Sequence, residues 1–305
     1  MAIIVAKLDM HADSAAARGR LSVVATPIGN LSDLSARALE VLAACDLIAA
    51  EDTRHTRTLL QHFGIDKPLL SLHDHNERDR AAELVQRMCT GTHVALVSDA
   101  GTPAISDPGY WLVCAAAQAG IEVVAIPGAC AAIAALSVAG LPSDRFCFEG
   151  FLPQQGGARR TRLAQLALET RTLVFYEAPH RIRESLDACV VAFGGLRAAV
   201  VAREITKHFE TIYRGTLDAL RERASSDKDF VRGEIVLIVA GALAPERATE
   251  RSVELDRVLN ILLAELPVRQ SSHLAAQLTG CRDNEAYKRA LALKKDGSSR
   301  SDAMD

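Results

Sequence analysis

Short apolar runs, separated by longer amphipathic segments, recur along most of the chain. Continuous apolar runs of about five residues are typical of strands that are buried on both faces. In the first half of the chain such runs occupy residues 21–25, 47–50, 69–72, 94–97 and 121–126. Because they alternate with segments of helical periodicity, they predict an α/β domain with a parallel sheet and right-handed crossovers.

The same pattern resumes after a break at the Gly-Leu-Pro-Ser stretch 140–143, with predicted strands at 146–151, 172–176, 198–202 and 235–240. Residues 255–293 instead have helical spacing, interrupted at Pro267 and stopped at Gly280, as in a small helix-turn-helix unit. The predicted organisation is a mobile extension (1–19), an N-terminal α/β domain (20–141), a C-terminal α/β domain (142–248), a helix-turn-helix-like region (249–296) and a disordered tail (297–305).

Composition narrows the class of protein. The 305 residues are 49% hydrophobic, enough for two cores, and the net charge of -3 excludes a global basic field for nucleic acid. The seven cysteines are scattered without metal-binding spacing. The sequence has neither a convincing signal peptide nor an apolar stretch long enough for a membrane helix, so we expect a cytoplasmic protein that does not bind a membrane.

Shaped loops follow three of the predicted strands. The longest, Ser-Asp-Ala-Gly-Thr-Pro-Ala-Ile-Ser-Asp-Pro-Gly at 98–109, can continue neither a strand nor a helix, because proline removes donors and glycine permits positive φ. The others are Thr-Pro-Ile-Gly-Asn at 26–30 and Pro-Gly-Ala-Cys-Ala-Ala at 127–132. Plain strand-to-helix turns need only a few residues. Loops at the carboxyl ends of parallel strands line the ligand crevice, so these loops predict a small-molecule site.

Clusters of acidic and basic residues follow three other strands, at 51–57, 177–181 and 203–208. Their repetition at strand ends predicts one cleft shared by the two domains. Asp52 or Thr53 is also expected to cap the helix that follows. The stretch His73-Asp74-His75 lacks further ligands at metal-binding spacing, so it is interpreted as a polar loop and no metal site is predicted.

Taken together, six motifs resemble those of a known family: residues 26–30, 50–54, 98–109, 126–128, 175–181 and 202–207. They are similar to the bacterial small-subunit ribosomal RNA ribose 2'-O-methyltransferases that modify a cytidine of the decoding centre, within the tetrapyrrole (corrin/porphyrin) methylases. The resemblance extends from Leu21 to the C-terminus. It implies two α/β domains with S-adenosylmethionine (SAM) held between them, a homodimer, and 16S ribosomal RNA of the small ribosomal subunit as substrate.

The resemblance also implies a role for individual residues. Contacts with SAM are implied for Thr26, Pro27, Gly29, Asn30, Asp99, Ala100, Gly101, Thr102, Pro103, Ile105, Pro127, Gly128, Ala129, Cys130, Ala131, Gly233 and Glu234. Residues implied to face the nucleotide are Glu51, Asp52, Arg54, Glu177, His180, Arg181, Arg203, Glu204 and Lys207. The family usually has Pro-Ser where this chain has Ala129-Cys130. The resemblance therefore implies backbone contacts to SAM at these two positions, without the side-chain hydroxyl that the family's serine offers.

The implied reaction requires sulfur, methyl group and acceptor oxygen to be collinear, which a rigid loop favours. It also requires the hydroxyl to lose its proton as the bond forms. Lys207 is a candidate base provided that neighbouring cations lower its pKa. The rival bases are Glu51, Asp52, Glu177 and His180, and the sequence leaves this choice open.

RNA binding must be local, because the chain as a whole is slightly acidic. The candidates for phosphate contacts are Arg159, Arg160, Arg162, Lys288, Arg289, Lys294 and Lys295. Three alternatives stay open: a tetrapyrrole C-methyltransferase, a SAM-binding regulator without catalysis, and a purely structural ribosome-assembly factor.

Overall fold

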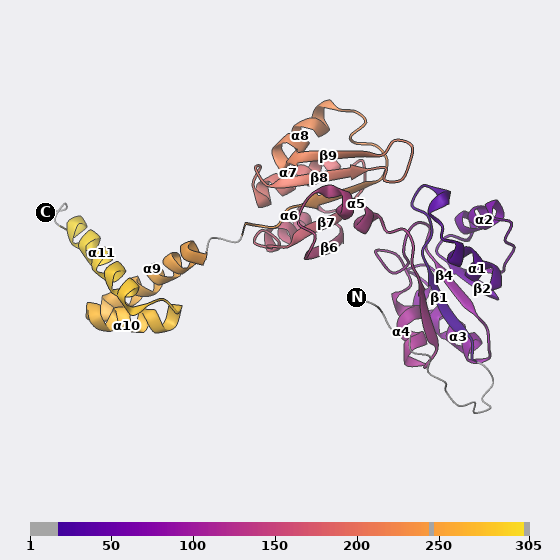
Figure 1. The fold of residues 1–305 in the computed structure, drawn as a ribbon, viewed down its shortest axis with the longest axis horizontal. Helices are drawn as coiled ribbons and strands as arrows, with labels where there is room; N and C mark the ends of the chain where they lie inside the picture. Colours follow the sequence, from indigo (N-terminus) through magenta and orange to yellow (C-terminus); the bar gives the residue numbers. More distant parts are fainter. Residues whose placement is uncertain (1–17, 244–246, 302–305) are drawn as a thin grey trace, which may run out of the picture. The chain divides into compact units, whose positions relative to one another are not determined.

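The computed structural model describes residues 18–243 and 247–301 (Figure 1). Its strands are β1 (Arg20–Val24), β2 (Leu47–Ala50), β3 (Leu69–Ser71), β4 (Val94–Val97), β5 (Glu122–Ile126), β6 (Phe146–Phe151), β7 (Thr172–Glu177), β8 (Ala198–Arg203), β9 (Thr211–Thr216) and β10 (Ile235–Val239). Its helices are the 3-10 helix η1 (Leu31–Asp33), α1 (Ala36–Ala44), α2 (Thr53–His62), α3 (Glu77–Cys89), α4 (Tyr110–Gln118), α5 (Ala131–Ala139), α6 (Gly156–Gln165), α7 (Ile182–Phe193), α8 (Leu217–Ser226), α9 (Arg247–Glu265), α10 (Val268–Thr279) and α11 (Asp283–Ser301).

The first sheet has the strand order β3-β2-β4-β1-β5, and all of its pairings are parallel. Strands β2 and β4 are buried along their whole length, which explains their unbroken apolar runs. Helices α1 and α2 pack on one face through Leu42 and Leu60, and α3 and α4 pack on the other through Leu84 and Leu112. The predicted strands and the parallel α/β class are confirmed.

The second sheet has the order β6-β7-β10-β8-β9 and is mixed. Strands β6 and β7 are parallel, whereas β10 runs antiparallel to both of its neighbours and β9 antiparallel to β8. The edge strand β9 is absent from the sequence predictions, because it buries only Tyr213 fully and alternates weakly. An edge strand of this kind carries little apolar signal.

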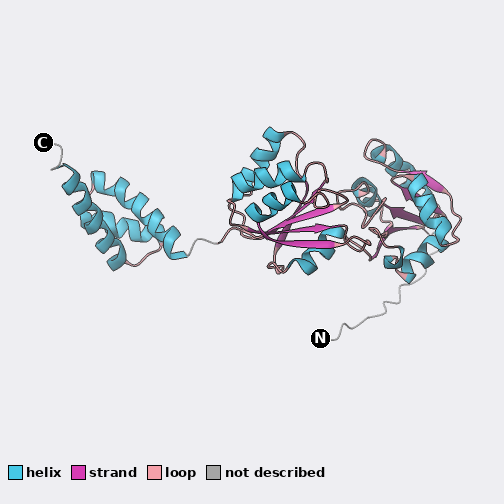
Figure 2. Cartoon of the chain, turned by 90° about the horizontal axis from the view of Figure 1, so that it is seen from above, coloured by secondary structure: helices cyan, strands magenta, loops and turns pink. Residues whose placement is uncertain are grey.

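Helices cover both faces of the second sheet, as Figure 2 shows. Successive residues of β7 alternate between the faces: Leu173 and Phe175 pack against α6, α7 and α8, and Val174 packs against α5. Helix α5 directly follows β5 of the first sheet, yet it buries Ala135 and Leu136 against the second sheet. The two sheets belong to one compact unit, Met1–Ala242.

The second unit, Leu243–Asp305, consists of α9, α10 and α11 in its described part. Pro267 precedes α10 and Gly280 ends it with a φ of 67°, so the predicted break and stop are confirmed. The core of this unit is formed by Leu255, Val258, Leu259, Ala275, Ala276, Ala286 and Ala290.

Both ends of the chain differ from the sequence predictions where they are described. The Gly19 amide donates to the Met88 carbonyl at 2.7 Å, and the Arg18 guanidinium donates to the Ala119 carbonyl, so the chain is anchored two residues before β1. Helix α11 continues to Ser301, beyond the start of the tail predicted as disordered. Residues 1–17 and 302–305 of the two predicted termini lie outside the described residues.

Candidate ligand site

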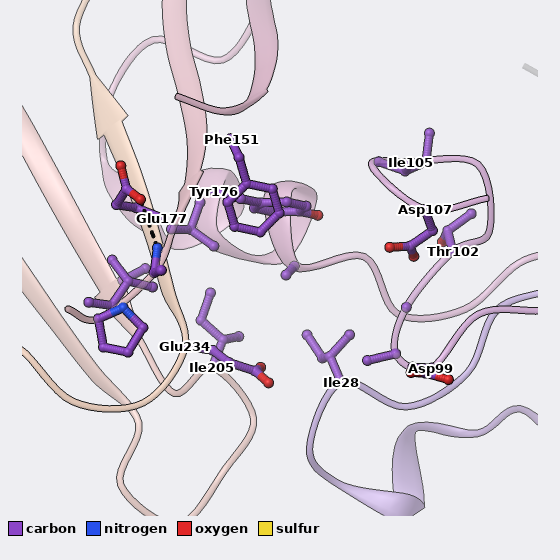
Figure 3. A pocket seen from close by; sticks show the side chains of 18 of the residues that line it. Ile28, Asp99, Thr102, Ile105, Asp107, Phe151, Tyr176, Glu177, Ile205 and Glu234 are labelled. Atoms are coloured by element: carbon purple, nitrogen blue, oxygen red, sulfur yellow. Dashed lines mark hydrogen bonds between the residues drawn. The ribbon is translucent and has the colours of Figure 1, made fainter. Parts of the chain in front are cut away.

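A pocket with a volume of about 400 Å³ is lined by residues from both sheets of the first unit (Figure 3). From the first sheet and its loops come Ile28, Glu51, Asp99, Ala100, Gly101, Thr102, Ile105, Asp107 and Ala131. From the second come Phe151, Tyr176, Glu177, Ala178, Pro179, Ala202, Ile205, Glu234, Ile235 and Val236. This volume lies in the range of small-molecule sites.

The loops of the first sheet meet here because parallel strands end at the same edge. Thr26 and Gly101 form an antiparallel bridge, with amide-to-carbonyl distances of 2.8 and 3.1 Å. The Thr102 hydroxyl donates to the Ala129 carbonyl at 3.0 Å. Three loops distant in sequence are thus joined into one wall.

Two glycines allow the loops of this wall to pack closely. Gly101 has a φ of 87°, and a Cβ there would lie 3.3 Å from Ile28 Cγ2. A Cβ on Gly128 would lie 2.9 Å from Ala25 Cβ, closer than the packing allows. A side chain at either position would displace part of the wall.

The loop at 98–109 is held in an unusual backbone conformation. Ala104 and Ser106 have φ values of 68° and 67°, a region that side chains other than glycine rarely occupy. Its far end is fixed by the buried Glu77 carboxylate, which accepts from the amides of Gly109 at 2.9 Å and Trp111 at 2.7 Å. Backbone strain that is maintained by such contacts is common at functional sites.

The cluster at 51–57 divides between the pocket and the start of α2. Asp52 is the N-cap, and it pairs with Arg54, whose side chain is exposed. These contacts hold the pKa of Asp52 well below its usual range, first through the Arg54 side chain. The Asp52 amide in turn donates to Asp99 at 3.0 Å, and Glu51 lines the pocket.

The second sheet supplies its residues through strand register. Glu177 at the end of β7 and Arg203 at the end of β8 both lie opposite Ile235 at the start of the antiparallel β10. The buried Glu177 accepts hydrogen bonds from the Ala178 amide and the Ser185 hydroxyl, and lies 3.3 Å from Arg181. Arg203 is also buried and donates to two backbone carbonyls, those of Arg232 and Phe209.

Aromatic rings form the remaining wall of the second sheet. Tyr176 packs against Phe148 and Phe151, with ring centroids 4.9 and 5.6 Å apart. The Tyr176 hydroxyl accepts from the Ala132 amide at 3.3 Å, and burial raises the pKa of Tyr176. Phe151 is 55% exposed although it faces the pocket, as Figure 3 shows.

Lys207 lies between two carboxylates, 2.9 Å from Glu204 and 3.1 Å from Glu234. Burial alone would lower the pKa of Lys207, but its hydrogen bonds to these carboxylates outweigh that effect and raise the pKa. Lys207 therefore does not meet the condition set for it as a base, a pKa lowered by neighbouring cations. The stem of Lys207 fills the space beside Gly29, where a Cβ would come within 2.3 Å of Lys207 Cγ.

The structure thus brings together some of the residues singled out in the sequence. Lining the pocket are Glu51, Asp99, Ala100, Gly101, Thr102, Ile105, Ala131, Glu177 and Glu234. Outside the lining lie Thr26, Pro27, Gly29, Asn30, Asp52, Arg54, Pro103, Pro127, Gly128, Ala129, Cys130, His180, Arg203, Glu204, Lys207 and Gly233. Several of these, including Thr26, Ala129 and Lys207, contact residues that line it or their loops.

Some lining residues, among them Asp107, Tyr176 and Ile205, have no site role among the sequence predictions. Asp107 is part of the long Pro/Gly loop, so the loop itself was the available signal. Burial raises the pKa of Asp107 to about 6, with smaller contributions from nearby carboxylates.

The basic residues near α6 have different environments. Arg159 is buried and pairs with Glu184 at 2.7 Å, so it is unsuited to the predicted phosphate contact. Arg162 pairs with Glu149, whereas Arg160 is exposed. In the helical unit Arg289 pairs with Asp256, Lys288 and Lys294 are exposed, and the Lys295 side chain lies outside the described part.

Within 18–243 and 247–301, no group of three or more histidine, cysteine or acidic side chains is arranged to hold a metal ion. No helix in this described part is both long and apolar enough to span a membrane.

Comparison with known proteins agrees with this geometry. Residues 20–221 match the family model for tetrapyrrole (corrin/porphyrin) methylases, and residues 249–294 match that of the RsmI C-terminal HTH domain. "Ribosomal RNA small subunit methyltransferase I" of Pseudomonas aeruginosa is 55% identical over 90% of this chain and 97% of its own length. The chain belongs to this methyltransferase family. The relative of that name from Escherichia coli O157:H7 is 50% identical over 93% of this chain and 99% of its own length.

Solved structures of tetrapyrrole methylases share the fold. The methyltransferase CobJ aligns with a TM-score of 0.55 at 21% identity, covering 73% of this chain and 95% of its own. The uroporphyrin-III C-methyltransferase of Thermus thermophilus aligns with a TM-score of 0.51 at 20% identity, covering 73% and 94%. At identities this low, the alignments show a common fold and nothing further.

Proposed function

We propose that this chain transfers a methyl group from SAM to the ribose 2'-hydroxyl of a decoding-centre cytidine in 16S ribosomal RNA. The observation that carries the proposal is the identity of 55% with a relative named as a ribosomal RNA small subunit methyltransferase, over nearly its whole length. The pocket between the two sheets supplies the site.

The residues present fit SAM as the donor. Gly101 lines the pocket, and Gly128 lets the loop after β5 pack closely against Ala25, where a Cβ would come within 2.9 Å. The pocket combines apolar side chains such as Ile28 and Ile205 with several carboxylates. This combination suits a molecule with an aromatic base and two positive charges. Bound SAM would supply an electrophilic methyl group on a sulfonium.

The chain's own task is positioning. The bridge between Thr26 and Gly101 and the Thr102–Ala129 hydrogen bond fix one wall, against which the donor is held. A target nucleotide must leave its stack to reach a pocket of this kind. The exposed Arg160, Lys288 and Lys294 are proposed phosphate contacts.

The test is incubation of purified protein with methyl-labelled SAM and small ribosomal subunits from cells lacking this gene. Nuclease digestion and mass spectrometry then locate the label. We expect it on the 2'-oxygen of one decoding-centre cytidine. Naked 16S ribosomal RNA, assayed in parallel, shows whether the assembled subunit is required.

The alternatives make different predictions in the same assay. A tetrapyrrole C-methyltransferase would label uroporphyrinogen and leave both RNA substrates unlabelled. A SAM-binding regulator would bind SAM without any labelled product, and an assembly factor would bind the subunit but not SAM. Sedimentation of the purified protein tests the homodimer that we also propose.

A further inference from the structure

The proposed reaction needs an acceptor for the hydroxyl proton, and five carboxylates line the pocket. They are Glu51, Asp99, Asp107, Glu177 and Glu234. A carboxylate that is committed to a cation or to backbone amides holds its charge in place and accepts a proton poorly. The partners of each carboxylate therefore separate the candidates.

Two carboxylates are committed to cations. Glu177 is buried against Arg181 and accepts from the Ser185 hydroxyl, while Glu234 pairs with Lys207 at 3.1 Å. Each of these two carboxylates therefore has a positive partner within ion-pair distance.

Two further carboxylates hold the backbone of the pocket. Asp99 Oδ1 accepts from the Asp52 amide at 3.0 Å, and Glu51 Oε2 accepts from the Asp99 amide at 3.3 Å. Together they connect the end of β2 to the loop after β4. Burial raises the pKa of Glu51 as well, but its carboxylate is engaged by the Asp99 amide, so a proton on Glu51 would weaken this connection.

Asp107 differs from the other four. Among the described residues, no cation forms an ion pair with its carboxylate. It is presented by the loop in which Ala104 and Ser106 have positive φ. In Figure 3 its carboxylate points into the cavity, near Thr102.

We propose that Asp107 is the general base of the methyl transfer, an inference that rests on the proposed function. The hydroxyl oxygen of the acceptor bonds to the methyl carbon, and the carbon–sulfur bond of the donor breaks with its electron pair left on sulfur. The hydroxyl proton passes to Asp107 Oδ. Charge and atoms balance, because the cationic sulfonium becomes a neutral thioether and the carboxylate a neutral acid.

The surroundings of Asp107 suit a base that works near neutral pH. Burial, followed by the negative charge of Glu51, raises the pKa of Asp107 to about 6. Asp99 and Asp74 raise this pKa further, whereas the Ser98 side chain lowers it. The charge of Asp107 in turn contributes to the raised pKa of Tyr176. A base with a pKa near the working pH combines ionisation with useful basicity.

The test is single-turnover methyl transfer measured against pH for the wild type and Asp107→Asn. The wild-type rate should rise with pH through about 6 and then level, because the carboxylate must be ionised to accept a proton. In Asp107→Asn the rate should fall by about a hundredfold or more and this rise should disappear. Asp107→Glu should restore the rise. Asp66→Asn, an equal change at an exposed position outside the pocket, is the matched control.

Calorimetry supplies a readout that does not depend on turnover. If Asp107 acts as the base, Asp107→Asn should bind SAM and S-adenosylhomocysteine about as well as the wild type does. A selective loss of SAM binding would instead assign Asp107 to holding the positive charge of the donor and would overturn the proposal. So would an Asp107→Asn enzyme that keeps the rise, or a Glu51→Gln enzyme that loses it. If the wild type labels no ribose at all, the proposed function itself fails.

Discussion

The two sheets contribute to the pocket in different ways. The first is entirely parallel and supplies loops whose shape is imposed by glycine, proline and residues with positive φ such as Ala104. The second is mixed and supplies acid–base clusters at its strand ends, one of which also contains the positive-φ residues Glu204 and Thr206. Most charges of the second sheet are already used within the fold: Glu177 holds Arg181, and Arg203 holds two backbone carbonyls.

This difference shows which sequence signals point to chemistry. A cluster of charges after a strand can serve the packing of an antiparallel junction, as Glu177 and Arg203 do on either side of β10. A long loop that bends its own backbone into strained conformations has no comparable benefit for folding. The loop at 98–109 is the more informative signal.

The largest effect on the free energy of unfolding should come from Glu177→Ala. Loss of this buried carboxylate leaves Arg181 with an unpaired charge, and breaking a buried pair in this way costs about 3–5 kcal/mol. Glu234→Ala is the matched control, because Glu234 is 72% exposed and its pair with Lys207 contributes about 1 kcal/mol or less. Urea denaturation measures both. If the Glu177 variant lost no more stability than Glu234→Ala, the buried pair of Glu177 with Arg181 would not be structural.

The next effect concerns the loop of the first sheet. Gly101→Ala should weaken SAM binding by about tenfold or more, because the new Cβ meets Ile28 while the backbone has a φ of 87°. Gly64→Ala is the matched control: its φ of 68° carries the same kind of backbone cost, about 1–2 kcal/mol, with no atom within 4 Å of the added Cβ. Calorimetry should separate the variants. Similar SAM affinities would mean that Gly101 serves folding alone.

How much the sequence predicts follows from the same physics. Apolar runs such as that of β4 predict the buried strands directly, and Pro/Gly composition predicts the loop at 98–109. The edge strand β9 and the packing of α5 on the second sheet depend on tertiary contacts that no local pattern encodes. The sequence also does not show which carboxylates form ion pairs. Glu177 pairs with Arg181, whereas no described cation pairs with Asp107, and no local sequence pattern distinguishes the two.

A smaller effect should come from Asp107, with the opposite sign. Its folded pKa of about 6 lies above its usual value, so the folded state binds the proton more tightly and stability falls as pH rises from about 4 to 6. At pH 7 Asp107→Asn should therefore be more stable than the wild type, by on the order of 1 kcal/mol, since residual contact with water screens the effect. Thermal melts across this range should show the advantage shrinking as the solution is acidified. A variant less stable than the wild type at pH 7 would place Asp107 among the structural charges.

The smallest effect on stability should come from Lys207, which contacts residues of both sheets. Its stem lies beside Gly29 in a loop of the first sheet, and its ammonium group pairs with Glu204 and Glu234 of the second. Because its pKa is raised, its stabilisation is complete below the unfolded pKa and is lost only as pH rises through the higher folded value. Lys207→Ala should cost about 1 kcal/mol or less, unchanged between about pH 6 and 9.

The rate of methyl transfer should respond to Lys207 more strongly than the free energy of unfolding does. Lys207→Ala should reduce methyl transfer while SAM affinity stays close to that of the wild type, and the reduction should be the same across this pH range, because a lysine that remains protonated acts by charge. Lys207→Met keeps the stem beside Gly29 and removes the charge, so it should reproduce the loss. Wild-type turnover in both variants would remove Lys207 from the site. A deficit confined to alkaline pH would instead indicate that Lys207 acts as the base, against the role proposed for Asp107.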